Sequence, residues 1–187
     1  MKASLNKITA RAALVLLWVA ALCLIDLTTK YLVVTELMDP PRVIPVTPFF
    51  NLVLAYNPGV SFGLFSDTMG SAPRLFALLQ GVIVIALVIW AVMAKTAAER
   101  VSITAIAGGA SGNVIDRFWN LSVTDYLDFH AFGWSWPAFN LADVFIVCGA
   151  FLLVAISLRP DRMRRLRPID FTISARGKAT SGPDVSS

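Results

Sequence analysis

Two carboxylates, Asp125 and Asp143, lie in the part of the chain where one apolar segment ends and the next begins. Carboxyl groups held close together cannot both ionise, so they share one proton. One of them can then act as a base on a water molecule while the other polarises a carbonyl. This pair predicts the chemistry of an aspartic hydrolase. Asp116 is the alternative to Asp125, but it directly precedes Arg117, and we interpret it as half of a buried ion pair with that residue.

Other catalytic chemistries find less support among the residues. The chain has one histidine, His130, and its two cysteines lie inside apolar runs, so a serine or cysteine hydrolase with an adjacent base is not expected. A metal site formed by Asp125, Asp128 and His130 is an alternative, because all three fall within six residues. Their spacing matches no known ligand signature. We therefore expect no metal and no cofactor, and we interpret Asp128 and His130 as solvated loop residues.

Two asparagines are spaced so that each lies beside a carboxylate. Asn113 precedes Asp116 by three residues, and Asn140 precedes Asp143 by three. Residues three apart share one face of a helix. We expect both pairs to point into a helix bundle and to contribute to one polar zone.

The composition indicates that membrane helices position these residues. Hydrophobic residues make up 57% of the 187 residues, charged residues make up 15%, and the mean hydropathy is +0.70. These values are too apolar for an average soluble domain. Backbone exposed to lipid must be hydrogen-bonded within a helix or a closed barrel, and segments of about 20 apolar residues can span a bilayer as helices. We predict an all-α membrane protein with four transmembrane helices, at about residues 12–30, 74–94, 101–118 and 138–158.

Spacings inside these segments add two expectations. Gly108 and Gly112 are four residues apart, which is the spacing that lets two helices approach closely. Asp26 and Lys30 are also four apart and can pair along the first helix. A basic start followed by an apolar run also describes a cleaved signal peptide. Because the sequence continues directly through Asp26 to Lys30, we expect the first helix to be retained.

The distribution of basic residues predicts the orientation. Twelve of the 16 Lys and Arg residues precede the first segment, lie between the second and third, or follow the fourth. The positive-inside rule makes these regions, and therefore both termini, cytoplasmic. The positive charges follow the sides of the membrane and form no patch with aromatic residues, so nucleic-acid binding is not expected. We predict a single four-helix domain, residues 1–158, and a basic, disordered cytoplasmic tail, residues 159–187.

Residues 31–73 form a long outer segment with structure of its own. Prolines interrupt its first half, and residues 49–56 are rich in aromatic and β-branched types and end at the turn Asn57-Pro58-Gly59. We predict a strand over Phe49–Tyr56, a second strand over Val60–Phe65, and hence a small extracytoplasmic β-sheet on the membrane surface between the first two helices.

This topology brings the intramembrane carboxylates to one side of the bilayer. Asp26 lies 14 residues beyond Ala12, about 21 Å along a helix at ~1.5 Å per residue, and Asp116 lies 15 residues beyond Val101. Asp143 lies near the start of a helix that begins outside. All three approach the outer surface, so we predict the polar zone at the outer leaflet.

Five blocks of the sequence together resemble the lipoprotein signal peptidases, also called signal peptidase II. They are, in order, Asp26-Leu-Thr-Thr-Lys30, Asn57-Pro-Gly-Val-Ser-Phe62, Gly108-Gly-Ala-Ser-Gly-Asn-Val-Ile-Asp-Arg117, Val123-Thr-Asp-Tyr126 and Pro137-Ala-Phe-Asn-Leu-Ala-Asp143. Each block alone is a weak signal, but five in the family's order across residues 12–158 are specific. The resemblance implies four helices, a small outer sheet and a membrane aspartic endopeptidase. Such an enzyme removes the signal peptide from lipid-modified prolipoproteins by cleaving before the diacylglyceryl cysteine.

The resemblance also implies roles for individual positions. Asp125 and Asp143 match the catalytic dyad of the family. The positions that bind substrate or support the site are Asp26, Lys30, Asn57, Gly59, Asn113, Asp116, Arg117 and Asn140. The implied partners are diacylglyceryl-modified prolipoproteins and membrane lipids, and the implied setting is a bacterial inner membrane, with the protein as a multi-pass monomer. Leu27, where the family usually has glutamine, and Tyr126, where it usually has phenylalanine, are departures.

Two other functional classes stay open at this point. A small proton-coupled transporter or channel would also use intramembrane carboxylates, but it predicts polar groups near the midplane and broken helices in paired halves. The sequence does not clearly show those features. A non-catalytic assembly factor would tolerate substitution of its acidic residues.

Overall fold

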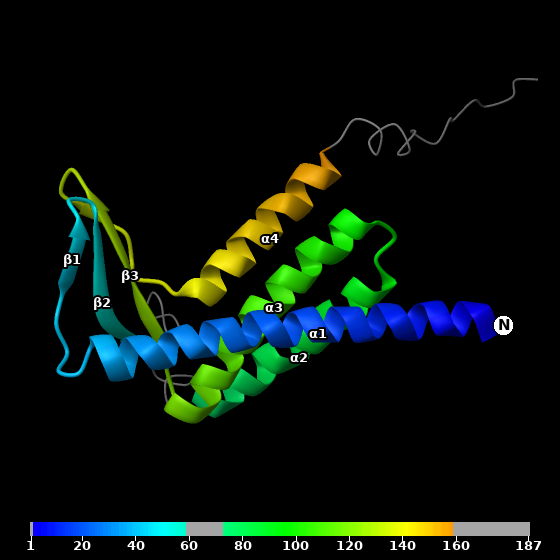
Figure 1. Cartoon of the computed structure of the whole chain (residues 1–187), viewed down its shortest axis with the longest axis horizontal. Coiled ribbons are helices and arrows are strands. Elements are labelled where there is room, and N and C mark those ends of the chain that lie inside the picture. Colours follow the sequence, from blue (N-terminus) through cyan, green and yellow to red (C-terminus); the bar gives the residue numbers. More distant parts are fainter. Residues whose placement is uncertain (1, 59–72, 159–187) are drawn as a thin grey trace, which may run out of the picture. The chain divides into compact units, whose positions relative to one another are not determined.

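The computed structural model describes residues 2–58 and 73–158. Its helices are α1 (Lys2–Leu32), α2 (Pro73–Met93), α3 (Ala97–Asn120) and α4 (Leu141–Ser157), and a π-helical turn, η1 (Val33–Leu37), continues α1. Its strands are β1 (Ile44–Thr47), β2 (Phe50–Asn57), β3 (Val123–Ala131) and β4 (Trp134–Ser135) (Figure 1). Three predictions fall outside the described residues: Gly59, the strand over Val60–Phe65, and the tail, residues 159–187.

The helices follow the apolar runs of the sequence. Among the described residues, α2 and the continuous helix Asn6–Leu37 have the length and composition to cross a membrane. Helix α4 is apolar but has 17 residues, and α3 carries several buried polar residues. A mostly helical fold with apolar helices is therefore confirmed, whereas the crossing of the membrane by all four helices stays a prediction.

Helix α3 packs against both α1 and α2, and small residues set its distance from α1. Gly108 faces Leu22 and Gly112 faces Asp26, each so closely that an added Cβ atom would overlap the facing side chain. The predicted close approach at these two glycines is confirmed, and its consequence is that Asp26 reaches α3. The apolar core beside this contact is formed by Val15, Val19, Ala91, Ala94, Ile103 and Ala107.

Strands β1 to β4 form one antiparallel sheet in chain order. The predicted strand over Phe49–Tyr56 is confirmed as β2, Phe50–Asn57. The sheet is not confined to the segment between the first two helices, because β3 and β4 come from the segment between α3 and α4. Strand β1, Ile44–Thr47, was not predicted either, so the sequence analysis missed three of the four described strands.

The prediction that Asp128 and His130 are loop residues was wrong. Asp125, Asp128 and His130 all lie in β3, where Asp125 pairs with Ala55 of β2. Aspartate is depleted in strands, so the two aspartates masked a run that otherwise contains β-branched and aromatic residues. Pairing with β2 satisfies the backbone and overrides that preference. Asp128 and His130 are half-buried in the sheet and are not solvated loop residues.

We expect Gly112→Ala to destabilise the protein by roughly 1–3 kcal/mol, the usual cost of overpacking, because the added methyl group would displace the Asp26 carboxylate. Gly81→Ala is the matched control, since a Cβ atom there would meet Val114 at 3.9 Å, an ordinary contact, and alanine favours helix. Thermal unfolding in detergent should give a lower Tm for the first variant and an equal or higher Tm for the second. An unchanged Tm for Gly112→Ala would contradict the close approach of α1 to α3.

Candidate functional site

Asn140 and Asp143 cap the N-terminus of α4. The Asn140 side-chain oxygen accepts a hydrogen bond from the backbone N–H of Asp143 (3.1 Å), and Asp143 Oδ2 accepts one from the backbone N–H of Asn140 (3.1 Å). This reciprocal pair is a capping box built from Asn and Asp, and it requires the three-residue spacing seen in the sequence. It also holds the Asp143 carboxylate at a helix N-terminus, where a negative charge is favoured.

Asp125 is presented to the same place by β3, and it is 3% exposed. Its Oδ1 accepts a hydrogen bond from Asn140 Nδ2 at 2.7 Å, and the side chain of Asn57, at the end of β2, also bonds to it. Burial raises the pKa of Asp125 from 3.8 to about 6, with the bond from Asn140 opposing the shift and the charge of Asp143 adding to it. Asp125 therefore keeps its proton at a pH where an exposed aspartate has lost it.

Asn113 of α3 links the two aspartates to the rest of the bundle. Its Nδ2 donates to Asp143 Oδ1 at 2.9 Å. Its Oδ1 accepts from Asn140 Nδ2 at 3.1 Å and from Lys30 Nζ at 2.8 Å. Because a lysine ammonium group can only donate, the oxygen of Asn113 must face Lys30 and its nitrogen must face Asp143. A cation on α1 thus sets which group Asn113 offers to a proposed catalytic carboxylate.

Lys30 is the buried cation beneath the site, and it is 4% exposed. Its Nζ lies 2.8 Å from Asp26 Oδ2 and 3.3 Å from Asp116 Oδ2, so with Asn113 it has three oxygen partners for its three donors. The expected pairing of Asp26 with Lys30 is confirmed. Asp26 Oδ1 also accepts the backbone N–H of Ala142 at 2.9 Å, which ties the first turn of α4 to α1.

Asp116, the alternative to Asp125 in the sequence analysis, has a different set of partners. Among the described residues its ion partner is Lys30 and not the adjacent Arg117, so our interpretation of that ion pair was wrong. Its Oδ2 accepts the backbone N–H of Thr124 at 2.7 Å. Since Thr124 directly precedes Asp125, Asp116 holds β3 at the point where the strand carries Asp125.

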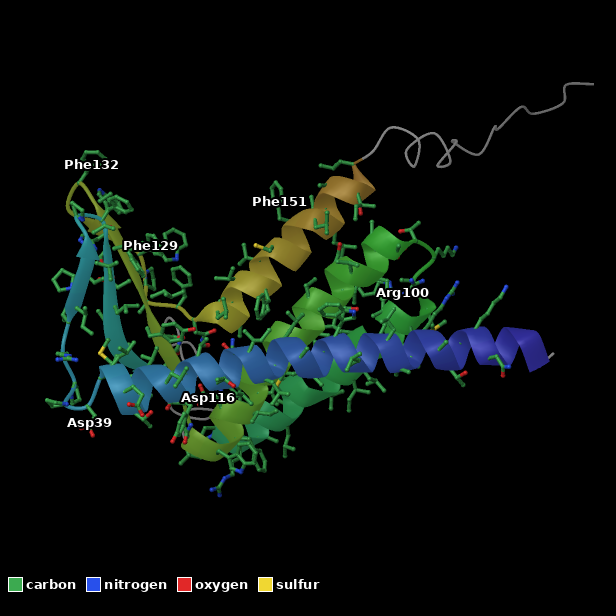
Figure 2. All side chains as sticks on the ribbon, viewed as in Figure 1. Asp39, Arg100, Asp116, Phe129, Phe132 and Phe151 are labelled. Carbon is green, nitrogen blue, oxygen red and sulfur yellow. The ribbon has the colours of Figure 1, made fainter. Side chains whose placement is uncertain are left out.

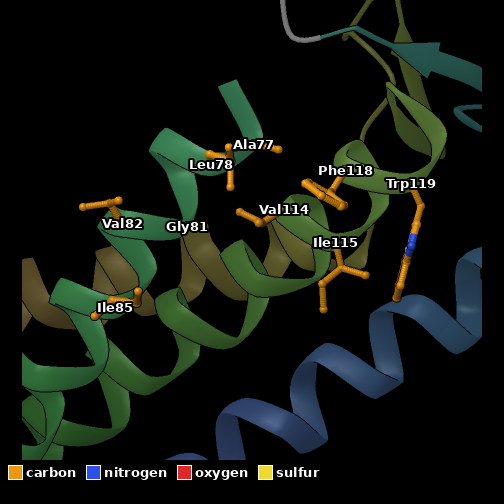
Figure 3. Close-up of a pocket in the computed structure, with 9 residues that line it drawn as sticks. All are labelled: Ala77, Leu78, Gly81, Val82, Ile85, Val114, Ile115, Phe118 and Trp119. Atoms are coloured by element: carbon orange, nitrogen blue, oxygen red, sulfur yellow. The ribbon is translucent and has the colours of Figure 1, made fainter. Parts of the chain in front are cut away.

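Arg117 lies on the side of α3 that faces α2. Its guanidinium group donates to Gln80 Oε1 and lies 5.1 Å from the centre of the Phe76 ring. The residue is buried, and within the described part of the chain its Nε has no hydrogen-bond partner. An apolar pocket lies between α2 and α3 on this side (Figure 3), lined by Ala77, Leu78, Gly81, Val82, Ile85, Val114, Ile115, Phe118 and Trp119.

The geometry separates the residues of the alternative metal site. Asp125 and Asp128 are three apart along β3, and alternate strand residues point to opposite faces. Asp128 Oδ2 accepts a hydrogen bond from Asn51 Nδ2 at 3.0 Å, away from Asp125. Within residues 2–58 and 73–158, no group of three or more His, Cys, Asp or Glu side chains is arranged to hold a metal ion.

Tyr126 has a role in the site that the sequence analysis missed. Its hydroxyl donates to Thr29 Oγ1 of α1 at 3.1 Å and also bonds to the backbone of Leu141, the first residue of α4. Thr29 Oγ1 in turn donates to the carbonyl of Asp26 at 2.8 Å. Tyr126 thus joins α1, α4 and β3 directly beside Asp125. The sequence could have indicated this role, because Tyr126 has a hydroxyl where the signal peptidase II family usually has phenylalanine, and a buried tyrosine hydroxyl usually has a hydrogen-bond partner.

Comparison with known proteins finds similar chains that are named lipoprotein signal peptidase. Residues 18–159 match the family described as Signal peptidase (SPase) II. The lipoprotein signal peptidase of Cupriavidus necator is 38% identical over 156 residues, which cover 81% of this chain and 86% of that protein. That of Pelagibacter ubique is 38% identical over 134 residues, which cover 71% of this chain and 80% of that protein.

Two solved structures share the fold. Both are described as bacterial membrane enzyme structures obtained by the in meso method, at 2.3 and 1.9 Å resolution. Each superposes on this chain with a TM-score of 0.67, at 27% and 29% sequence identity respectively. The alignments cover 84% and 79% of this chain and 94% of each solved chain.

We expect Tyr126→Phe to lower the free energy of unfolding by about 1–2 kcal/mol, because it removes the buried hydroxyl together with its hydrogen bonds to Thr29 and to the backbone of Leu141. Tyr56→Phe is the matched control, since Tyr56 is 56% exposed. Tm in detergent should fall for the first variant and not for the second. The double variant Tyr126→Phe with Thr29→Val should lose less than the sum of the two single losses. Additive losses would show that the hydroxyls of Tyr126 and Thr29 do not interact.

Proposed function

The chain belongs to the signal peptidase II family, and from that membership and the geometry of its polar site we propose the reaction that it catalyses. It is an aspartic endopeptidase that removes the signal peptide from lipid-modified prolipoproteins by hydrolysing the peptide bond before the diacylglyceryl cysteine. The observation that carries this proposal is one hydrogen-bond network, in which Asn140 and Asn113 join Asp125 to Asp143.

In the proposed mechanism Asp125 and Asp143 share one proton. Asp143, which the Asn140 backbone and the Asn113 side chain hold in place by hydrogen bonds, acts as the base and takes a proton from the attacking water. Asp125, whose raised pKa favours its protonated form, donates to the carbonyl oxygen of the substrate. The tetrahedral intermediate collapses when Asp143 passes its proton to the leaving nitrogen and Asp125 recovers its own. The C–N bond then breaks, which frees the amine of the lipidated cysteine.

We place this chemistry at the outer leaflet of a bacterial inner membrane. In this arrangement α1 to α4 all cross the bilayer, both termini are cytoplasmic, and residues 1–158 form one domain. Its support is the apolar composition of α1 and α2 together with the location of the polar network, which joins the later part of α1 and the last turns of α3 to the first turn of α4. Asp125 then lies just outside the helices, on β3.

The substrate's lipid and peptide parts meet different surfaces in this proposal. An acyl chain fits the apolar pocket between α2 and α3, whose residues Leu78, Val82 and Ile85 are about half to two-thirds exposed, at 58%, 64% and 61%. The peptide adds as a strand to β1, which is an edge strand of the sheet. The scissile bond then lies between these two surfaces.

We expect Asp125→Asn and Asp143→Asn each to lower kcat by about 10²–10⁴-fold, the usual contribution of a positioned acid or base. The assay is cleavage of a diacylglyceryl-modified prolipoprotein by purified protein in detergent. Asp128→Asn is the matched control, since it changes an aspartate of the same strand on the opposite face, and it should retain activity. Full cleavage by both dyad variants, or loss of cleavage by the wild-type protein in the presence of a chelator, would contradict the proposed mechanism.

The thermal stability of Asp125→Asn should show whether this variant loses activity without losing the fold. The pKa of Asp125 is raised from 3.8 to about 6, so the folded state gains stability from the neutral carboxyl below about pH 4 and loses it as pH rises through 6. Asparagine is neutral at every pH. At roughly 1.4 kcal/mol per pH unit, the variant should gain up to about 3 kcal/mol at pH 8 and nothing at pH 4. A lower Tm at pH 8 would contradict the burial assigned to this carboxyl.

The pH profile of kcat/KM tests the shared proton. Activity should fall with rising pH as the dyad loses its proton, with an apparent pKa at or above about 6, well above the ordinary value for aspartate. Asn140→Ser keeps a capping oxygen for Asp143 but removes the Nδ2 donor that favours ionised Asp125. This variant should move the alkaline limb to higher pH. A limb that stays in place would mean that Asn140 does not act on the titrating carboxyl.

A further inference from the structure

The β3–β4 hairpin, residues 131–136, exposes large aromatic side chains that the proposed reaction does not use. Phe132 is 103% exposed, Trp134 is 84% exposed and Trp136 is 70% exposed. Phe132 lies at the tip of the sheet (Figure 2). The stretch from Ala131 to Pro137 contains no charged residue. A patch of this kind marks a surface that meets a membrane or another molecule.

The hairpin's aromatic residues continue an apolar face of the sheet. Ala131 pairs with Trp134, and alternate residues of a strand share a face, so Trp134 lies on the face of Phe129. The ring of Phe129 stacks on Phe50 with centroids 4.6 Å apart. Aromatic side chains thus run along this face from β2 to the hairpin.

The opposite face of the same strands is polar. Asp128 Oδ2 accepts a hydrogen bond from Asn51 Nδ2 at 3.0 Å, and Asp128 Oδ1 accepts one from Ser135 Oγ at 3.4 Å. His130 pairs with Ser135 across β3 and β4. The outer part of the sheet is therefore amphipathic, with one aromatic face and one face of carboxylate, amide, hydroxyl and imidazole groups.

Helix α4 begins on the aromatic face. The ring of Phe139, which lies just before α4, stacks on Phe129 with centroids 5.8 Å apart. Figure 2 shows Phe129 on the side of β3 toward α4. Helix α4 exposes Val147 (65%) and Phe151 (76%), and these residues meet lipid in the proposed membrane arrangement. The aromatic face and the lipid-facing helix are therefore on the same side of the sheet.

We propose that the β3–β4 hairpin is a membrane anchor, which inserts Phe132, Trp134 and Trp136 into the lipid–water interface of the outer leaflet. Aromatic rings, and tryptophan above all, favour that depth because they have an apolar body and can carry a polar edge. The occupant of the patch is the phospholipid bilayer, since the uncharged hairpin continues the apolar side of an amphipathic sheet. This inference rests on the proposed membrane arrangement.

The anchor has a consequence for the proposed dyad. Asp125 lies on β3, seven residues before Phe132, about 23 Å along a strand at ~3.3 Å per residue. Contacts with α3 and α4 hold the near end of this strand, and the bilayer holds its far end. The strand that carries Asp125 is thereby fixed relative to the membrane surface, where the lipidated cysteine of a substrate also lies.

Spin-label accessibility tests the anchor without using activity. Phe132→Cys carries the nitroxide, and Ser135→Cys, on the polar face of the same hairpin, is the matched control. Both are made with Cys23→Ala and Cys148→Ala and reconstituted into phosphatidylethanolamine–phosphatidylglycerol vesicles. The label at 132 should be relaxed by oxygen, which concentrates in lipid, and the label at 135 by a water-soluble nickel chelate.

Three outcomes would overturn the proposal. Equal relaxation of both labels by the nickel chelate would place the hairpin in water. A label at 132 shielded from both reagents would place it against protein, and dipolar broadening between labels would identify a second copy of this chain. None of these results depends on whether the protein cleaves prolipoproteins, so they leave the proposed reaction to its own assay.

Kinetics give a second measurement. The triple variant Phe132→Ser, Trp134→Ser, Trp136→Ser should raise KM for a lipid-modified prolipoprotein in vesicles by about three- to tenfold and leave kcat nearly unchanged, because the side chains are exposed and far along the strand from Asp125. The conservative double variant Trp134→Phe with Trp136→Phe, which keeps the aromatic rings, should have the KM of the wild-type protein. An unchanged KM for the triple variant in vesicles would contradict the anchor.

Discussion

The burial of the Lys30 ammonium group is the constraint on which the rest of the site depends. A buried charge is costly unless it is paired and hydrogen-bonded, and here Asp26, Asp116 and Asn113 supply one oxygen each. Every one of these partners also bonds to another element: Asp26 to the start of α4, Asp116 to the start of β3, and Asn113 to Asp143. Lys30 has all its hydrogen-bond partners only when α1 packs against α3. Those partners complete their own hydrogen bonds only when α4 and β3 pack there too. The contacts that stabilise the fold therefore also assemble the site.

Local geometry explains the part of the site that could be predicted from the sequence. Asn140 and Asp143 are joined by a capping box, which requires their three-residue spacing, and Asp26 and Lys30 lie about one helical turn apart, so spacing alone placed each pair together. The close approach at Gly112 is equally local, since a missing side chain can be read from the residue type. Strand β3 could not be predicted in this way, because it is stabilised by pairing with β2, which lies far away in the sequence. The sequence of β3 itself does not indicate which strand it pairs with.

The wrong partner for Asp116 has a similar physical cause. Adjacent residues on a helix point in directions about 100° apart and do not face each other, so Asp116 and Arg117 diverge: the first reaches Lys30 on α1, and the second reaches Gln80 on α2. The packing of α1 and α2 on different sides of α3 is tertiary structure, which could not be predicted from the single sequence. The same holds for the hydroxyl of Tyr126, whose partner Thr29 is on another element. Charge and residue type predicted that these groups need partners, but not which ones.

The two carboxylates of the proposed dyad also differ in how the backbone supports them, and this difference supplies the asymmetry that a shared proton needs. Asp143 lies in the first turn of α4, where the helix N-terminus favours an anion. Asp125 lies on a strand, which offers no comparable dipole, and burial favours its neutral form. Asn140 couples the two environments, since its oxygen caps α4 beside Asp143 while its nitrogen donates to Asp125. One side chain therefore starts the helix and joins the pair. The proton can reside mainly on Asp125 because the effect of burial outweighs the opposing hydrogen bond from Asn140.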